Sequence, residues 1–243
     1  MSRKYLGLAL GALLLAASAG PTQGQMAPPA APLESKFFKP GELDVSTLLP
    51  PPPKDDAPAA VEGRAELHRI AAARSPERLA QAKWDDEHED VTVIAAVLGP
   101  AFDLKRFPAT AQLFADLRNE DNVAAKQAKA YFRRERPFLN DPQLDVCDDG
   151  HDRANSYPSG HATMAFAAAA ALAQLMPGNA QIILAQAADY SESRLVCGVH
   201  YRSDIVASQV LGNVLVARLS AKPAFAAELE AARAELTAAH IAP

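Results

Sequence analysis

Three short segments of the chain carry the residue types that transfer of a phosphate group requires. One places Lys129 seven residues before Arg136, another reads Pro-Ser-Gly-His and ends at His161, and the third places His200 four residues before Asp204. Cations bind phosphoryl oxygens, and histidines act as nucleophiles, acids or bases. The three segments together predict a phosphate-transfer site that works without a metal, and no other stretch of the sequence offers a competing site.

The basic segment is predicted to lie on a helix that runs to Arg136 and is stopped by Pro137. On that helix Lys129 and Arg136 would share one face, with Arg133 on or near it. Like charges on one helical stripe repel each other unless an anion or an acid neutralises them, which favours an anion-binding role. A solvated basic face relieved by nearby acids such as Glu135 is the alternative for this segment taken alone.

Ser159 and Gly160 stand where a polar loop enters a strongly helical stretch. At a helix start, serine and glycine leave backbone N–H groups free and allow an anion to approach closely. His161 would then face whatever those amides hold. An ordinary helix cap with an incidental histidine is the alternative for this segment alone.

His200 and Asp204 are spaced so that, in a helix or its first turn, the carboxylate can reach a ring nitrogen. Such a pair fixes the tautomer and keeps the other nitrogen available as a nucleophile or base. Arg194 precedes the pair and can bind phosphate oxygens through two N–H groups. A surface ion pair is the alternative here. Because order, spacing and residue identity agree across all three segments, one common site is favoured over three unrelated features.

The elements that position these segments are predicted to be helices, because alanine is abundant, glycine is sparse and alternating β-branched runs are almost absent. Helical stretches are expected at 62–84 with a break at Ser75-Pro76, and at 90–98, 110–117, 122–136, 161–175, 179–195, 203–219 and 224–239. This pattern predicts an all-α fold, a single bundle-like domain over residues 61–243.

The N-terminal residues predict export. Residues 1–19 have the basic start, short apolar run and small-residue cleavage site of a signal peptide, and residues 20–60 form a proline-rich extended arm, either mobile or wrapped on the surface. No later stretch is apolar and long enough to span a bilayer, so no membrane association is expected. The mature protein is therefore predicted to be soluble in the periplasm, with secretion as the alternative.

Composition and cysteine content agree with an exported enzyme that acts on small anions. The 243-residue chain carries a net charge of −5, which argues against a broad nucleic-acid-binding surface. Its two cysteines, Cys147 and Cys197, are predicted to form a disulfide in an oxidising compartment. Two free, buried thiols are the alternative.

The combined motif, K-x6-RP, PSGH and SR-x5-H-x3-D, resembles the signature of the type 2 phosphatidic acid phosphatase/vanadium haloperoxidase superfamily. More narrowly, the chain is similar to the bacterial class A non-specific acid phosphatases, which are exported, soluble and all-helical. The text around the motifs agrees, as in Ser156-Tyr157 before Pro158 and in Val196-Cys197-Gly198-Val199 before His200. The resemblance extends from about residue 62 to 219 and leaves out the proline-rich arm.

The resemblance implies a role for each residue of the site. The phosphoryl group would be held by Lys129, Arg136, Ser159, Gly160 and Arg194. His200, oriented by Asp204, would attack phosphorus and form a phosphohistidine, while His161 would protonate the leaving alcohol and then activate water. The implied activity is broad hydrolysis of small phosphate monoesters at acid to neutral pH, with no metal or cofactor and with inorganic phosphate or vanadate as inhibitors.

Other activities fit the same motifs. A vanadium-dependent haloperoxidase uses the same residues, because vanadate mimics pentacoordinate phosphorus. A lipid phosphate phosphatase would need membrane spans, and a catalytically inactive relative would bind phosphate without turnover. Transfer of phosphate to alcohols is expected as a side activity. A homodimer is a further expectation, although no residue specifies it.

Overall fold

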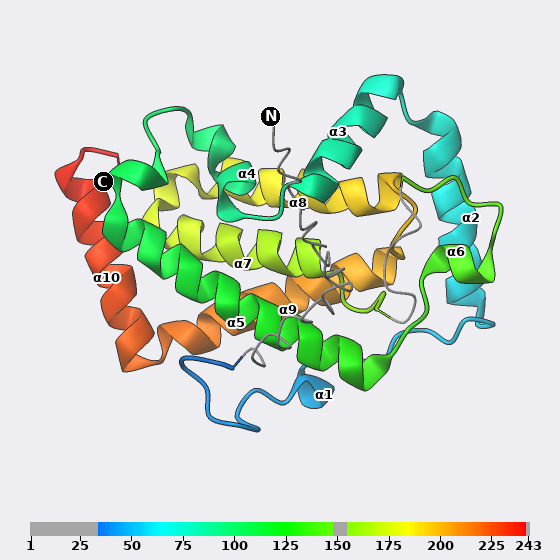
Figure 1. Cartoon of the computed structure of the whole chain (residues 1–243), viewed down its shortest axis with the longest axis horizontal. Helices are drawn as coiled ribbons and strands as arrows, with labels where there is room; N and C mark the ends of the chain where they lie inside the picture. Colours follow the sequence, from blue (N-terminus) through cyan, green and yellow to red (C-terminus); the bar gives the residue numbers. More distant parts are fainter. Residues whose placement is uncertain (1–33, 148–154, 242–243) are drawn as a thin grey trace, which may run out of the picture. The chain divides into compact units, whose positions relative to one another are not determined.

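The computed structural model describes residues 34–147 and 155–241, and every regular element in those ranges is helical (Figure 1). The predicted signal peptide lies outside the described residues. The α-helices are α1 (Val45–Leu48), α2 (Pro58–Ala73), α3 (Pro76–Glu87), α4 (Val91–Ala95), α5 (Pro108–Phe132), α6 (Pro137–Asn140), α7 (Gly160–Leu175), α8 (Ala180–Val196), α9 (Arg202–Ser220) and α10 (Pro223–Ala238). Short 3-10 turns η1 (Ala96–Leu98), η2 (Leu104–Arg106) and η3 (Pro177–Asn179) complete the set. The all-α fold predicted from the sequence is confirmed.

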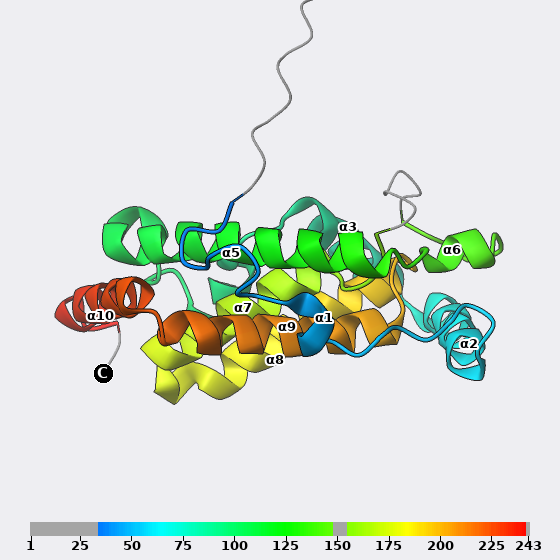
Figure 2. The same cartoon turned by 90° about the horizontal axis from the view of Figure 1, so that it is seen from below.

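The centre of the fold is α7, which α5, α8 and α9 surround (Figures 1 and 2). Half of its residues are alanines and most of these are buried, so neighbouring helices can approach closely. One such close approach is at Gly212 of α9, where an added Cβ would lie 2.8 Å from the backbone nitrogen of Ala167 and 2.9 Å from the carbonyl oxygen of Thr163. Only glycine fits at this crossing.

The basic segment departs from the sequence-based prediction. The two helices expected at 110–117 and 122–136 are one continuous helix, α5, which ends at Phe132. Arg133 takes a left-handed conformation (φ 50°, ψ 38°), and Arg136 is extended because Pro137 follows it. The prediction that Lys129, Arg133 and Arg136 share one helical face is therefore wrong: Arg133 is exposed, whereas Arg136 is buried.

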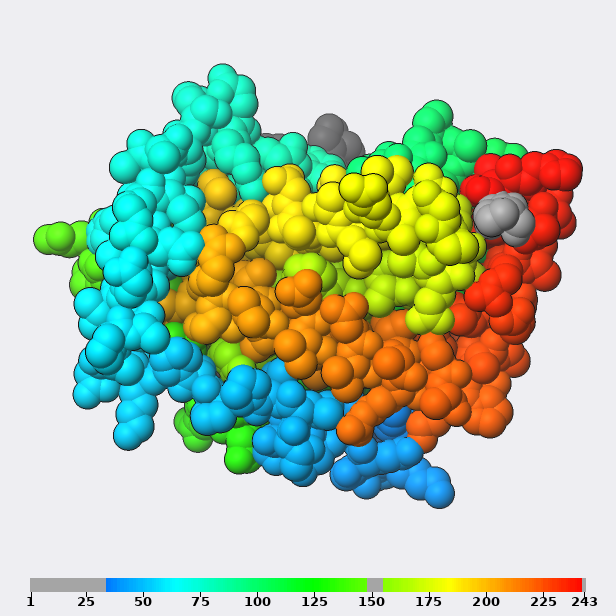
Figure 3. Space-filling view, turned by 180° about the vertical axis from the view of Figure 1, so that it is seen from behind, coloured from blue at the N-terminus to red at the C-terminus, as the bar shows by residue number. Residues whose placement is uncertain are grey.

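The described part of the proline-rich arm packs against the helices. Its apolar side chains Phe38, Leu43, Val45 and Leu49 are buried in the main core. Seen from behind, residues 34–57 run along one edge of the molecule beside α9 (Figure 3). Tyr157, close to the second motif, donates a hydrogen bond of 2.7 Å to the carbonyl oxygen of Pro50. The boundaries proposed for the arm and the helical domain stay predictions, and α2 begins at Pro58.

The predicted disulfide between Cys147 and Cys197 is present. It joins the segment after α6 to the end of α8, immediately before the turn that carries His200. A backbone hydrogen bond of 3.1 Å from Cys147 to the carbonyl oxygen of Cys197 supports the same connection. The turn is thereby tied to a segment 50 residues earlier in the chain.

Candidate active site

The first turn of α7 supplies the serine, the glycine and one histidine of the predicted site. Ser159 is the N-cap residue, and its carbonyl oxygen accepts hydrogen bonds from Thr163 (2.8 Å) and Ser208 of α9 (3.0 Å). These bonds fix the turn on the helix core. A Cβ placed on Gly160 would lie 3.6 Å from Lys129 Nζ, so the lysine reaches the amino end of α7. Backbone N–H groups and a cation therefore meet there, as an anion site requires.

The second histidine is fully enclosed at the start of α9. His200 is 1% exposed, and its Nδ1 lies 3.4 Å from Oδ2 of Asp204, at the long end of hydrogen-bond range. Asp204 also accepts hydrogen bonds from Ser156 (2.6 Å), the backbone of Tyr201 (2.9 Å) and Arg134 (2.6 Å). Burial raises the pKa of Asp204, and Arg134 and the Ser156 hydroxyl act against that rise.

Arg136 fixes which ring nitrogen of His200 carries a lone pair. Its Nη1 donates to His200 Nε2 at 3.0 Å and to the carbonyl oxygen of Val199 at 2.9 Å. Because a guanidinium only donates, Nε2 must accept, and the ring proton then resides on Nδ1 facing Asp204. Burial, followed by Arg136, Arg194 and Lys129, lowers the pKa of His200 well below its ordinary value. The ring is a neutral imidazole whose lone pair faces the cationic side chains.

Lys129 belongs to the same electrostatic group. Burial lowers the pKa of Lys129 to about 8, and the positive charge of Arg136 acts in the same direction. Glu89 raises it by a smaller amount. The lysine is therefore charged at neutral pH and loses its proton within the mildly alkaline range.

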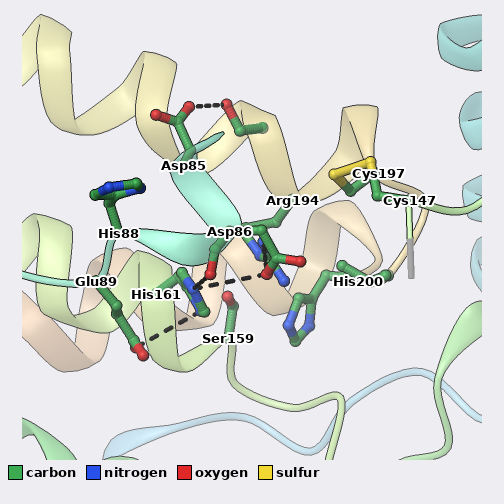
Figure 4. A network of polar contacts seen from close by, with 12 residues as sticks. Asp85, Asp86, His88, Glu89, Cys147, Ser159, His161, Arg194, Cys197 and His200 are labelled. Carbon is green, nitrogen blue, oxygen red and sulfur yellow. Dashed lines mark hydrogen bonds and ion pairs between the residues drawn. A yellow bond between two sulfur atoms is a disulfide. The ribbon is translucent and has the colours of Figure 1, made fainter. Parts of the chain in front are cut away.

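Two carboxylates that the sequence reading missed, Asp86 and Glu89, also reach the site (Figure 4). Asp85 anchors the end of α3 on α8, because its carboxylate accepts from Ser193 at 2.5 Å and its carbonyl oxygen from Tyr190 at 3.1 Å. Asp86 therefore faces Arg194 of α8, which donates to its Oδ1 at 2.5 Å. Nothing in the local sequence signalled this, since Asp86 and Arg194 are 108 residues apart in the chain.

His161 lies between these two carboxylates. Its Nε2 is 3.1 Å from the carbonyl oxygen and 3.8 Å from Oδ1 of Asp86, and its Nδ1 is 3.6 Å from Oε1 of Glu89. Burial lowers the pKa of His161 to about 3, Arg194 acts in the same direction, and Asp86 opposes them. Without a bound anion the ring is therefore neutral over most of the acid range.

All the predicted site residues thus meet at one place, the amino ends of α7 and α9 and the end of α8. The residues concerned are Lys129, Arg136, Ser159, Gly160, His161, Arg194, His200 and Asp204. The sequence reading also missed Arg134, which holds Asp204 and Ser203 from within the basic segment. Its place among the basic residues 126–136 could have suggested a role in the site, but Arg134 is not one of the motif positions. Two histidines among clustered cations on an all-helical fold are the groups expected of a phosphoryl-transfer enzyme.

Comparisons with known proteins identify the family. A model of the PAP2 superfamily matches residues 114–225. The non-specific acid phosphatase of Salmonella typhimurium is 31% identical over 208 residues, which cover 82% of this chain and 83% of that one. An acid phosphatase of Zymomonas mobilis is 29% identical over 208 residues, covering 81% and 78% of the two chains. The chain belongs to the non-specific acid phosphatases of the PAP2 superfamily, and it is an enzyme of that kind.

A solved structure also aligns with the chain. It is a transmembrane PAP2 type phosphatidylglycerolphosphate phosphatase from Bacillus subtilis, 20% identical, with a TM-score of 0.45 over 68% of this chain and 86% of that one. Among the residues described here, no helix combines the length and apolar character needed to cross a membrane.

Proposed function

We propose that the enzyme hydrolyses small phosphate monoesters through a phosphohistidine on His200, without a metal ion. The observation that carries the proposal is the environment of His200: a buried neutral ring whose Nε2 faces Arg136 while Nδ1 faces Asp204. A fixed tautomer with an outward lone pair is what in-line attack on phosphorus requires. The proposal gives Lys129, Arg136 and Arg194 the charge stabilisation that metal ions provide elsewhere.

In the first step, the His200 Nε2 lone pair attacks phosphorus and the bond to the leaving oxygen breaks. Arg136 must release Nε2 and turn to a phosphoryl oxygen, which its second interaction with Val199 allows it to do without leaving the site. The proton on His161 passes to the leaving oxygen. A bound phosphate dianion favours that proton, because the negative charge raises the pKa of His161 from its depressed value.

In the second step, water attacks the phosphohistidine. Neutral His161 takes a proton from the water as the P–N bond breaks, and His200 regains its lone pair. Inorganic phosphate leaves, and its retention by the same cations makes it a product inhibitor, as vanadate would be. An alcohol in place of water gives phosphate transfer as a side activity.

We also infer that the protein acts outside the cytoplasm, in the periplasm or after secretion. The disulfide between Cys147 and Cys197 supports this, because such bonds persist in oxidising compartments. The predicted signal peptide at residues 1–19 would direct the protein to the export machinery. N-terminal sequencing of the exported protein tests both: a chain that starts after residue 19 is expected, and one that retains Met1 would contradict the inference.

The deciding experiment measures phosphate release from p-nitrophenyl phosphate by the purified protein at acid to neutral pH, with and without EDTA. Activity is expected to survive EDTA and to fall by at least about a thousandfold in His200→Ala, the scale seen when a catalytic nucleophile is removed. Phosphohistidine trapped after an alkaline quench, in which its P–N bond is stable, would identify the intermediate directly.

His68→Ala is the matched control, because His68 is an exposed histidine paired with Asp141. It should keep its activity. Vanadate-dependent oxidation of bromide with no phosphate release would instead indicate a haloperoxidase.

A further inference from the structure

Glu89 is an acidic side chain inside a cationic site. Its Oε1 lies 3.6 Å from His161 Nδ1 and 3.5 Å from the point where a Cβ on Gly160 would be, beside Lys129. The side chain is 30% exposed, so part of it is reached by solvent, and Figure 4 shows it beside His161. A carboxylate in this position repels an anionic ligand.

Glu89 lies near the place that the leaving group of the substrate would occupy. In the proposed reaction His161 delivers its proton to the leaving oxygen, so that oxygen lies within hydrogen-bond reach of a His161 nitrogen. Both ring nitrogens have a carboxylate within 4 Å, Glu89 at Nδ1 and Asp86 at Nε2. The leaving group therefore passes next to a carboxylate whichever nitrogen delivers the proton.

The two carboxylates differ in how fully their charge is compensated. Asp86 pairs with Arg194 at 2.5 Å. Glu89 pairs with Arg118 at 3.1 Å, but Arg118 also binds the buried Asp121 at 2.6 Å. One guanidinium thus serves two carboxylates, and the group of Glu89, Arg118 and Asp121 keeps a net negative charge when both acids are ionised.

We propose that Glu89 selects substrates by the charge of their leaving group, favouring phosphate monoesters of cationic or neutral alcohols over those of anionic ones. The selection rests on the proposed role of His161. It acts on the part of the substrate beyond the phosphoryl group, because Glu89 flanks His161, which in the proposed reaction protonates the leaving oxygen. The phosphoryl oxygens are the part that the proposed reaction assigns to Lys129, Arg136 and Arg194.

Three phosphate monoesters with different leaving-group charges test this: choline phosphate (+1), phenyl phosphate (0) and 4-carboxyphenyl phosphate (−1). For each, kcat/KM of Glu89→Gln is divided by that of the wild type, so the intrinsic reactivity of each ester cancels. The assay is run at pH 7.5, because burial raises the pKa of Asp121 to about 7 and Arg118 is shared between two ionised acids above that pH.

Removal of the charge should raise the ratio for the anionic ester about 3- to 10-fold relative to phenyl phosphate and lower it for choline phosphate by a similar factor, the scale of one partly screened charge pair. A purely structural role would change all three ratios equally, and that result would overturn the proposal. Glu89→Ala removes the same charge with a different side chain, so its kcat/KM ratios must rank the three esters in the same order as those of Glu89→Gln.

Glu87→Gln is the control, since Glu87 is an exposed carboxylate two positions earlier and its loss changes the net charge equally. Its three ratios should stay near one. The proposed role of His200 is tested separately. If His200→Ala hydrolyses phenyl phosphate as fast as the wild type does, the proposed function fails, whatever the ratios measured for Glu89→Gln.

Discussion

Asp204 depends on a residue outside the recognised motifs. Arg134 is 5% exposed, donates to Oδ1 of Asp204, and stacks its guanidinium 3.9 Å from the ring centroid of Tyr201. A buried carboxylate without a cation would tend to take up a proton. Arg134 is thus a positioning residue: it keeps Asp204 an acceptor for His200, whereas Arg136 in the motif contacts His200 itself.

Lys129 gives a prediction about phosphate binding at alkaline pH. Because its pKa is lowered to about 8, its charge is lost above that pH, and binding of inorganic phosphate should weaken as the pH rises. Between pH 7.5 and 9.5 the inhibition constant of phosphate should increase on the order of tenfold. In Lys129→Arg, whose guanidinium stays charged, the increase should be much smaller.

The matched control is Lys126→Arg, one helical turn earlier and exposed. It should show the wild-type dependence on pH. An inhibition constant that does not change with pH in the wild type would show that Lys129 remains protonated throughout this range.

At the scale of elements, the site depends on how closely four helices, α3, α7, α8 and α9, pack against one another. The amino end of α7 carries Ser159 and His161, and α9 holds the carbonyl of Ser159 through Ser208. The end of α8 carries Arg194, and α3 docks on it through Asp85. A shift of α7 against α9 would therefore move His161 relative to His200.

Gly212→Ala tests this dependence. The new methyl group would meet backbone atoms of α7 at 2.8–2.9 Å, so the helices must separate. We expect a loss of about 1–3 kcal/mol in the free energy of unfolding, measured with urea, together with reduced activity on p-nitrophenyl phosphate. Gly178→Ala, where no atom lies within 4 Å of the added Cβ, should change neither quantity appreciably. Equal effects at the two positions would show that the helix crossing is not the cause.

At the scale of the whole molecule, the proline-rich arm contributes to the core. Proline prevents regular helix there, yet the intervening apolar residues are buried against α5 and its neighbours. Ser35 and the backbone of Lys36 also bind Glu120 of α5, each at 2.6 Å. The arm therefore behaves as part of the folded protein, and a homodimer remains a prediction that the single chain does not test.

Truncation distinguishes the arm from the segment before it. A protein that starts at Gly20 should fold and be active, whereas one that starts at Ala57 loses the buried Phe38, Leu43, Val45 and Leu49. Each buried side chain contributes about 1.5–3 kcal/mol, so their sum is comparable to the whole stability of a domain. We expect the shorter protein to be unfolded or insoluble by circular dichroism. A cooperative thermal transition in that protein would contradict the expectation.

The sequence alone determined the chemical groups, the helices and the family. Helices follow from local preferences, so α2, α3, α7, α8, α9 and α10 lie close to the expected ranges. The i to i+4 spacing of His200 and Asp204 likewise brought the two together as expected, because one turn of backbone is enough to do so. The disulfide followed from the number of cysteines and the expected compartment.

Only the tertiary structure decided which acids enter the site. Asp86 and Glu89 meet Arg194 and His161 because Asp85 docks α3 on α8, a contact between segments about a hundred residues apart that no local pattern specifies. The end of α5 was also decided beyond local preference, since Arg133 turns left-handed and Arg136 reaches His200 from outside the helix. Sequence spacing determines which side chains meet within one or two turns of a helix. The packing of whole helices determines which side chains from different helices meet in the site.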